Sequence, residues 1–381
     1  MAGSRVVGRR LLALDGLRGL AAVAIVIHHA WMFSAHGMTL ADRALDELRL
    51  GVTLFFVLSG YLLYGPFVAA ALDRRAQPSR RRYALKRAAR ILPAYWLVLI
   101  GAFALTTAVH HPMRVEASQL PLFFVFAQNQ VEAVRGQLDP PLWSLAVEAS
   151  FYVLLPVVAI AVARLGRDRR SQLLLVAALG AAGLLCCALG TALHWPRTVT
   201  DSLLTTLPLF ACGMAVAVAT HGRSLSARSG TLLALAGLPL ILAGAAIESA
   251  AGLQAGALRL LVSDFPAAAG FALVVAALVA TPLRARPLLA APVLFAGTIS
   301  YGLYLWHFPV IYGLHAAHLW PSPPIPAMAL ALALTFVPAT VSWFVLEQPV
   351  LRWAHQRRRR ASAPSASPLR RDSRRAAALP G

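Results

Sequence analysis

The chain has 381 residues, of which 59% are apolar and only 13% are charged, and its mean hydropathy is +0.67. Soluble domains carry about a quarter charged residues, so this composition excludes an ordinary soluble protein. The net charge of +20 would suit a nucleic-acid-binding protein, but the basic residues lie in short stretches between apolar blocks without interleaved aromatic residues, so no nucleic-acid partner is expected.

Ten apolar blocks are each long enough to cross a bilayer, which takes about 20 helical residues. Lipid offers the backbone no hydrogen-bond partners, so these spans must be helices. We therefore predict an all-α polytopic membrane protein of about ten transmembrane helices. The predicted spans are 11–34, 51–72, 90–109, 142–164, 172–192, 200–220, 231–250, 257–281, 291–315 and 326–350.

Three stretches need a separate interpretation. The block 11–34 is too long for the apolar part of a cleaved signal peptide and contains ionisable residues, so it is interpreted as a retained span. The segment 110–141 contains a short apolar run, 120–127, which is expected to be re-entrant or interfacial. Residues 354–381 are rich in Arg, Ala, Ser and Pro and are predicted to be a disordered basic tail that contacts lipid headgroups. The transmembrane domain is accordingly 1–353.

Basic residues alternate strongly from one connecting segment to the next. Of the 35 Lys and Arg residues, 28 fall in the set of segments that begins with the N-terminus, and only six fall in the other set. Because Lys and Arg accumulate on the cytoplasmic side of membrane proteins, this excess predicts a multi-pass protein of the cytoplasmic (inner) membrane with both termini in the cytoplasm.

Charged residues inside spans are costly, so each one is a candidate for function. Arg18 and His29 are eleven residues apart in the first span and therefore share a helix face. Counted from the span ends, His29, Glu148 and His307 fall at nearly one depth in the outer half of the membrane. Near the inner face, a second cluster is predicted from Arg18, Arg87, Arg90 and Glu347.

The outer cluster suits proton transfer, because a neutral imidazole accepts a proton and a nearby Glu148 carboxylate would orient the ring. The inner arginines suit phosphate groups, which guanidinium binds through paired hydrogen bonds. Structural alternatives remain open: His29 could form only a helix–helix hydrogen bond, Glu347 could pair with Arg352, and the aromatic residues near these positions could be packing or interfacial residues.

Six local sequences occur in order along the chain, and together they carry a family resemblance. They are LDGLRGLAAVAIVIHHAW (14–31), GVTLFFVLSGYLL (51–63), RRYALKRAARILPAYW (81–96), LWSLAVEASFYVLLPV (142–157), ISYGLYLWHFPVI (299–311) and FVLEQPVLRW (344–353). This set resembles the acyltransferase 3 family of membrane-bound O-acyltransferases, in the form without a fused SGNH-type esterase-like domain. Any second, extracytoplasmic catalytic module is therefore expected to be a separate partner protein.

The family motifs fall on specific residues. The basic residue and His of the first span correspond to Arg18 and His29, and the Arg-x-x-Arg motif to Arg87 and Arg90. The remaining motifs place Trp143, Ser144 and Glu148 in the fourth span, Ser300, Tyr301, Tyr304 and His307 in the ninth, and Glu347 near the end of the last.

The resemblance implies an enzyme that transfers an acyl group, often acetyl, from acyl-CoA to a hydroxyl of a carbohydrate or glycosylated acceptor. His29 and Glu148 would be catalytic, and Arg18, Arg87 and Arg90 would bind the CoA donor. Trp143, Ser144, Ser300, Tyr301, Tyr304 and His307 would bind the acceptor or stabilise the oxyanion.

Two routes remain open at this point, direct attack by the acceptor hydroxyl, which we favour, and a covalent acyl-histidine. Neither route requires a metal, and no metal is expected. The alternative function is a proton-coupled transporter of a sugar or lipid-linked substrate, which would also use intramembrane His, Glu and Arg, although no internal repeat is evident.

Overall fold

The computed structural model describes residues 2–354, except residue 38 and the stretches 166–167, 254–255 and 282–284. Across this part of the chain the regular secondary structure is helical and no strand occurs. Nine of its helical segments are long and apolar enough to cross a membrane. The prediction of an all-α polytopic membrane protein is therefore confirmed, whereas the predicted tail lies outside the described residues apart from Ala354.

Two long helices of the first half, α4 (Arg80–Ala108) and α7 (Arg169–Ala192), begin at polar caps. Ser79 accepts a hydrogen bond from the backbone N–H of Arg82, and Asp168 does the same for Ser171. Such caps satisfy donors that a helix start leaves unpaired. The helices are α1 (Ala2–Met32), α2 (Leu40–Asp46), α3 (Gly51–Leu72), α4 (Arg80–Ala108), α5 (Leu120–Phe124), α6 (Leu142–Leu165) and α7 (Arg169–Ala192).

The second half continues the alternation of long helices and short connections, with Ser202 and Ser226 as caps of α9 and α10. Its helices are α8 (Arg197–Thr200), α9 (Leu203–Thr220), α10 (Ala227–Ala251), α11 (Ala257–Arg259), α12 (Phe265–Ala280), α13 (Ala291–Thr298), α14 (Ser300–Ala316) and α15 (Pro324–Ser342). Two π-helical turns, Leu260–Asp264 and Trp343–Glu347, lead into α12 and extend α15.

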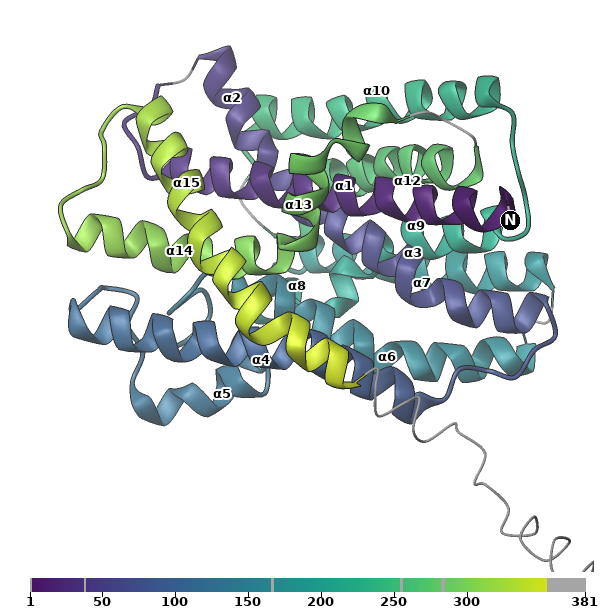
Figure 1. Cartoon of the computed structure of the whole chain (residues 1–381), viewed down its shortest axis with the longest axis horizontal. Coiled ribbons are helices and arrows are strands. Elements are labelled where there is room, and N and C mark those ends of the chain that lie inside the picture. The colour runs from purple at the N-terminus through teal and green to yellow at the C-terminus, as the bar shows by residue number, and fades with distance from the viewer. Residues whose placement is uncertain (1, 38, 166–167, 254–255, 282–284, 355–381) are drawn as a thin grey trace, which may run out of the picture.

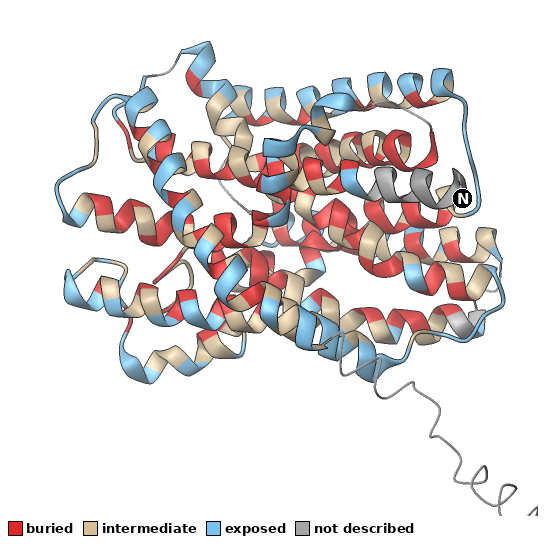
Figure 2. Ribbon diagram, in the orientation of Figure 1, coloured by how far each residue is buried: buried red, intermediate tan, exposed pale blue. Residues whose placement is uncertain are grey.

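The long helices run side by side, so the bundle has two ends (Figure 1). One end, which we call the proximal end, holds the N-terminus and the connections 73–79 and 221–226. The other, the distal end, holds α2 and the connections 109–119 and 317–323. Buried residues concentrate along the middle of the bundle (Figure 2).

Close packing of α3 against α9 depends on two glycines. A Cβ atom on Gly60 would collide with the carbonyl oxygen of Phe210, and one on Gly213 would collide with that of Val57. Small residues at a helix crossing allow two backbones to approach, which is how membrane helices gain contact area in the absence of a hydrophobic driving force. This crossing fixes α3, whose other residues line both cavities described below.

The ninth predicted span, 291–315, is not one continuous helix. Ile299 separates α13 from α14, and the Ser300 hydroxyl donates to the carbonyl oxygen of Gly297, 2.8 Å away. On the other side of the break, Gly297 packs directly against the backbone of Asp15 in α1. Hydropathy shows only the length of an apolar block, so it did not reveal this interruption.

Candidate active site

His29 and His307 come from helices far apart in sequence and meet inside the bundle. Nε2 of His307 is 3.1 Å from Nδ1 of His29. The Phe308 ring packs edge-on against His29, with centroids 4.8 Å apart. Because His307 is fully buried, this contact is held in place by the surrounding helices. The depth argument predicted that these two histidines lie at one level, and the structure brings them into contact.

The hydrogen bonds of these histidines define which nitrogen carries a proton. A neutral imidazole has one donor and one acceptor nitrogen. Nδ1 of His307 lies 2.6 Å from the carbonyl oxygen of Tyr304, so that nitrogen donates and Nε2 accepts. Nδ1 of His29 must then be the donor toward His307 and toward the Ile25 carbonyl oxygen, 3.1 Å away. This leaves Nε2 of His29 as the atom that can accept a proton.

The His29 side chain lines a cavity of about 190 Å³, which we call the distal cavity. Its walls come from α1, α3, the start of α6 and the segment that leads into α12. The polar and aromatic residues that line it are His28, His29, Arg49, Thr53, Phe56, Trp143, Arg259, Asp264 and Tyr304. The cavity therefore combines a basic nitrogen with several hydrogen-bonding groups.

A network of charges surrounds this cavity. Nη1 of Arg49 donates to Asp264 at 2.8 Å, and Thr53 donates to the same carboxylate oxygen at 3.3 Å. Arg49 also contacts Glu248 and, at 3.3 Å, Glu47. These side chains are largely buried, so each charge needs the opposite charge beside it to offset the cost of leaving water.

The three predicted arginines line a second cavity, of about 110 Å³, which we call the central cavity. Arg18 comes from α1, and Arg87 and Arg90 come from the first half of α4. Among the described residues, neither Arg18 nor Arg87 has a carboxylate within ion-pair distance. These two guanidinium groups are thus available to a bound anion.

Glu148 also lines the central cavity, and this corrects one expectation. Its carboxylate accepts a hydrogen bond from Ser59 at 2.5 Å, whereas His29 bonds to His307 and Ile25. The prediction that Glu148 orients the His29 ring is therefore wrong, because His307 contacts that ring instead. The depth count failed because Ser144 and Glu148 lie one turn apart on one face of α6, and that face turns toward the arginines.

Tyr304 lies between the two cavities and lines both of them. Its hydroxyl donates to the carbonyl oxygen of Pro141 at 2.8 Å and lies 2.6 Å from the Ser144 hydroxyl. Val52 and Phe56 of α3 also line both cavities. One tyrosine and two apolar side chains are thus the wall between the arginine-lined and the histidine-lined space.

Arg90 is more restrained than the other two arginines. It pairs with Glu347 at 3.2 Å, and its guanidinium lies over the rings of Trp343 and Tyr301, 5.3 Å and 5.8 Å from their centroids. Glu347 itself is 1% exposed and also accepts from Ser342. The structure thus pairs Glu347 with Arg90, rather than with Arg352, and Arg90 lines the central cavity together with Arg18 and Arg87.

Of the remaining predicted residues, two bond to backbone carbonyl groups and one packs against an aromatic ring. Tyr301 donates to the carbonyl oxygen of Ile91 at 3.0 Å, and Ser300 caps the break before α14. Trp143 packs edge-on against Phe56, with ring centroids 6.1 Å apart. The hydroxyls of Tyr301 and Tyr304, which were predicted to stabilise an oxyanion, already donate to carbonyl groups. Both residues instead form part of the cavity walls.

Sequence reasoning missed the charged wall of the distal cavity. Glu248, Arg259 and Asp264 all fell within or at the edge of predicted spans, so the cost of burying charge was a signal that could have identified them. Asp264 and Glu347 each end a π-helical turn, a geometry frequent at functional sites. Within the described ranges, no group of three His, Cys, Asp or Glu side chains could hold a metal ion.

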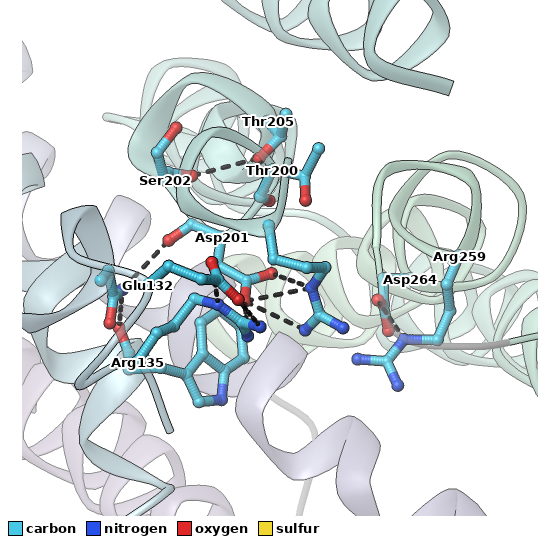
Figure 3. Close-up of polar contacts among 11 residues, drawn as sticks. Glu132, Arg135, Thr200, Asp201, Ser202, Thr205, Arg259 and Asp264 are labelled. Carbon is cyan, nitrogen blue, oxygen red and sulfur yellow. Dashed lines mark hydrogen bonds and ion pairs between the residues drawn. The ribbon is translucent and has the colours of Figure 1, made fainter. Parts of the chain in front are cut away.

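A second charge network holds the distal segment 110–141 against the bundle. Figure 3 shows Asp201 beside Arg135 and, further along, Arg259 beside Asp264. Asp201 accepts from Arg135 at 3.3 Å and from Arg197 at 3.0 Å. Nearby, the amide of Asn129 donates to the carbonyl oxygens of Asp201 and Trp143. These bonds fix Trp143 at the wall of the distal cavity.

Asp139, in the same distal segment, is a buried carboxyl group whose protonation should affect the stability of the protein. It is 1% exposed, neither carboxyl oxygen has a hydrogen-bond partner among the described residues, and burial raises its pKa well above the ordinary value. Above about pH 4 the unfolded chain has released the Asp139 proton, whereas the folded protein still retains it. The free energy of unfolding therefore falls as the pH rises from about 4 toward the raised pKa of the folded state. Asp139→Asn should raise the thermal midpoint more at pH 8 than at pH 5. An equal shift at both pH values would contradict this expectation.

Two bacterial O-acetyltransferases are similar to this chain over about nine tenths of its length. The chain is 26% identical over 364 residues to "Peptidoglycan O-acetyltransferase OatA" of Listeria monocytogenes, covering 89% of this chain and 55% of the relative. It is 24% identical over 362 residues to "O-acetyltransferase OatA" of Staphylococcus aureus, covering 90% of this chain and 57% of the relative. The chain thus spans little more than half the length of these curated relatives.

No solved structure matches the chain. The profile of the acyltransferase 3 family, described as "Acyltransferase domain", matches residues 11–346, which include both histidines, all three arginines and the walls of both cavities. The chain belongs to the acyltransferase 3 family.

Proposed function

We propose that this protein is a membrane O-acyltransferase that moves an acetyl group from acyl-CoA to a hydroxyl of a carbohydrate acceptor. The observation that carries the proposal is the position of His29: its ring, oriented by His307, lines one cavity, and an arginine-lined cavity lies directly behind Tyr304. The names of the Listeria and Staphylococcus relatives support O-acetyl transfer, and the word peptidoglycan in the Listeria name supports an envelope glycan as the acceptor.

The donor would enter from the proximal end. Exposed Arg80, Arg81 and Arg82 begin α4, and Arg87 follows at the mouth of the central cavity. Guanidinium groups bind phosphates through paired hydrogen bonds, so Arg87, which lines the cavity, suits a phosphate of CoA, whereas the exposed arginines would only attract the anion to this end over a longer range. The proximal end would then face the cytoplasm, where the excess of Lys and Arg also predicts it to be.

The chemistry requires one proton to move twice. Nε2 of His29 takes the proton of the acceptor hydroxyl, and the oxygen attacks the thioester carbonyl carbon. The C–S bond then breaks, the ester forms, and His29 returns the proton to the departing sulfur to give the CoA thiol. Direct attack is favoured because the described residues of the distal cavity offer no Cys or carboxylate nucleophile beside His29 except Asp264, which is already bonded to Arg49 and Thr53.

Membranes that contain the protein, supplied with labelled acetyl-CoA and envelope glycans, test the proposal. Label should enter the glycan, free CoA thiol should appear in equal amount, and mild alkali should release the label as expected for an ester. A proton-coupled transporter, the alternative, would instead move an unmodified substrate without consuming thioester. Absence of thioester consumption in membranes with folded protein would overturn the acyltransferase proposal.

Arg87→Ala should raise the KM for acetyl-CoA while changing kcat much less. Each charge-assisted hydrogen bond to phosphate contributes about 1.5–3 kcal/mol, which corresponds to roughly a tenfold to hundredfold rise in KM. Arg81→Ala is the matched control, because Arg81 lies on the same helix but is exposed and does not line the cavity. Initial rates at varied acetyl-CoA give both constants. Equal KM values for Arg87→Ala and Arg81→Ala would argue against donor binding in the central cavity.

A further inference from the structure

The proposed function leaves open where the acceptor binds and which acceptors are accepted. If the donor occupies the central cavity, with its thioester at the boundary formed by Val52, Phe56 and Tyr304, the acceptor hydroxyl approaches Nε2 of His29 from the distal cavity, which His29 lines. The distal cavity, at about 190 Å³, is smaller than the range of about 300–1,000 Å³ typical of drug-sized ligands. It therefore suits a single ring-sized group rather than an extended chain.

The polar side chains of this cavity suit a hydroxyl-bearing ligand. Nη1 of Arg49 and Nε of Arg259 lie 2.8 Å and 3.6 Å from the Asp264 carboxylate, so the three side chains hold one another at the cavity wall. Both arginines line the cavity, together with the Asp264 carboxylate and the Thr53 hydroxyl. A sugar hydroxyl both accepts and donates, so it can bond to guanidinium and to carboxylate at once.

One wall of the cavity is aromatic. Trp143 and Phe56 line it side by side, and Asn129 holds the Trp143 backbone in place. A sugar ring presents hydroxyls at its edge and C–H groups on its faces, so it matches a site with polar groups on one side and aromatic carbon on the other. The combination is better suited to a saccharide ring than to a fatty chain.

The charge balance of the network restricts the ligand further. Two guanidinium groups, those of Arg49 and Arg259, are surrounded by the carboxyl groups of Glu47, Glu248 and Asp264. The cations are thus already compensated, and no excess positive charge remains for an anionic sugar. A carboxylate placed in the cavity would lie close to Asp264 and be repelled.

We propose that the distal cavity is the acceptor subsite and that it takes one uncharged sugar ring in preference to a uronic acid. This inference rests on the proposed function, since it assumes that His29 acts on a hydroxyl. It assigns Arg49, Arg259 and Asp264 to ring hydroxyls and Trp143 to the ring face. Glu47 and Glu248 determine the charge selection without lining the cavity.

Competition against the glycan-labelling reaction tests the inference with two matched probes. The methyl glycosides of glucuronamide and of glucuronic acid have the same ring hydroxyls and nearly the same size, but only the second, with its free carboxylate, carries a charge. The amide should inhibit label incorporation at a concentration at least about tenfold lower than the acid, because like charges at this range in a partly buried site repel strongly. Arg259→Gln should weaken inhibition by the amide.

Removing a carboxylate of the network should narrow the difference between the probes. Glu248→Gln, or Glu47→Gln if the first variant is not folded, should reduce the ratio of inhibitory concentrations, whereas Glu132→Gln on the exposed distal segment should leave it unchanged. Equal inhibition by both probes, or no inhibition by either, would overturn the inference while acetyl transfer to glycan still stands. Failure of the uninhibited reaction would instead count against the proposed function.

Discussion

His29→Ala should reduce acetyl transfer by about 10²- to 10⁴-fold, because a positioned general base contributes that much to such a reaction. The loss should appear in kcat, with the KM for acetyl-CoA nearly unchanged, since the arginines that would bind the donor line the other cavity. Glycan labelling and thiol release, measured on equal amounts of folded protein, provide the two readouts.

His28 offers a matched control for this variant. It precedes His29 in α1, is equally part of the distal cavity and is 5% exposed, but its Nδ1 lies 3.4 Å from the carbonyl oxygen of Leu45 and 3.7 Å from Asp46. His28→Gln should therefore retain most of kcat. His307→Ala should fall between the two, because it removes the acceptor that fixes the His29 tautomer but leaves the base. Comparable losses for His28→Gln and His29→Ala would refute the assignment.

The spanning helices could be predicted from sequence because lipid allows only helices of a certain length and apolar character to cross it. Apolar length and the alternation of basic segments predicted every continuous spanning helix, to within a few residues in most cases and within about ten at the longest starts. These signals do not predict the interruption at Ile299. It depends on the hydrogen bond from the Ser300 hydroxyl to the Gly297 carbonyl oxygen and on the close approach of Gly297 to α1. That contact is tertiary, so no local pattern predicts it.

The site was predictable in part for the same reason. His29 and His307 were predicted to share a depth, and in the structure their helices also turn both side chains toward each other. Glu148 shows the limit of that method, because contact also depends on which way a helix face turns. Rotation about the α6 axis brings Glu148 to Ser59 and the arginines, although its count from the span end resembles that of His29.

Glu347→Ala should destabilise the protein strongly, because it leaves the Arg90 guanidinium buried without its carboxylate. Removing one partner of a buried ion pair costs about 3–5 kcal/mol. The pair is held at 3.2 Å, with Glu347 1% exposed and the Arg90 side chain 20% exposed, so water can compensate only part of the loss. Thermal unfolding of detergent-purified protein should show a clearly lowered midpoint. Asp73→Asn is the control, since the Asp73–His221 pair is at the proximal surface and its loss should change the midpoint little.

Replacing both partners separates stability from donor binding. In Arg90→Met combined with Glu347→Leu, no charge is left unpaired, and the Met side chain can pack between the Trp343 and Tyr301 rings that now flank the guanidinium. The midpoint should recover most of the loss seen with Glu347→Ala. If Arg90 also binds the donor, this stable variant should still show a raised KM for acetyl-CoA. A recovered midpoint with an unchanged KM would limit Arg90 to holding α4 against the end of α15, and would assign donor binding to Arg18 and Arg87 alone.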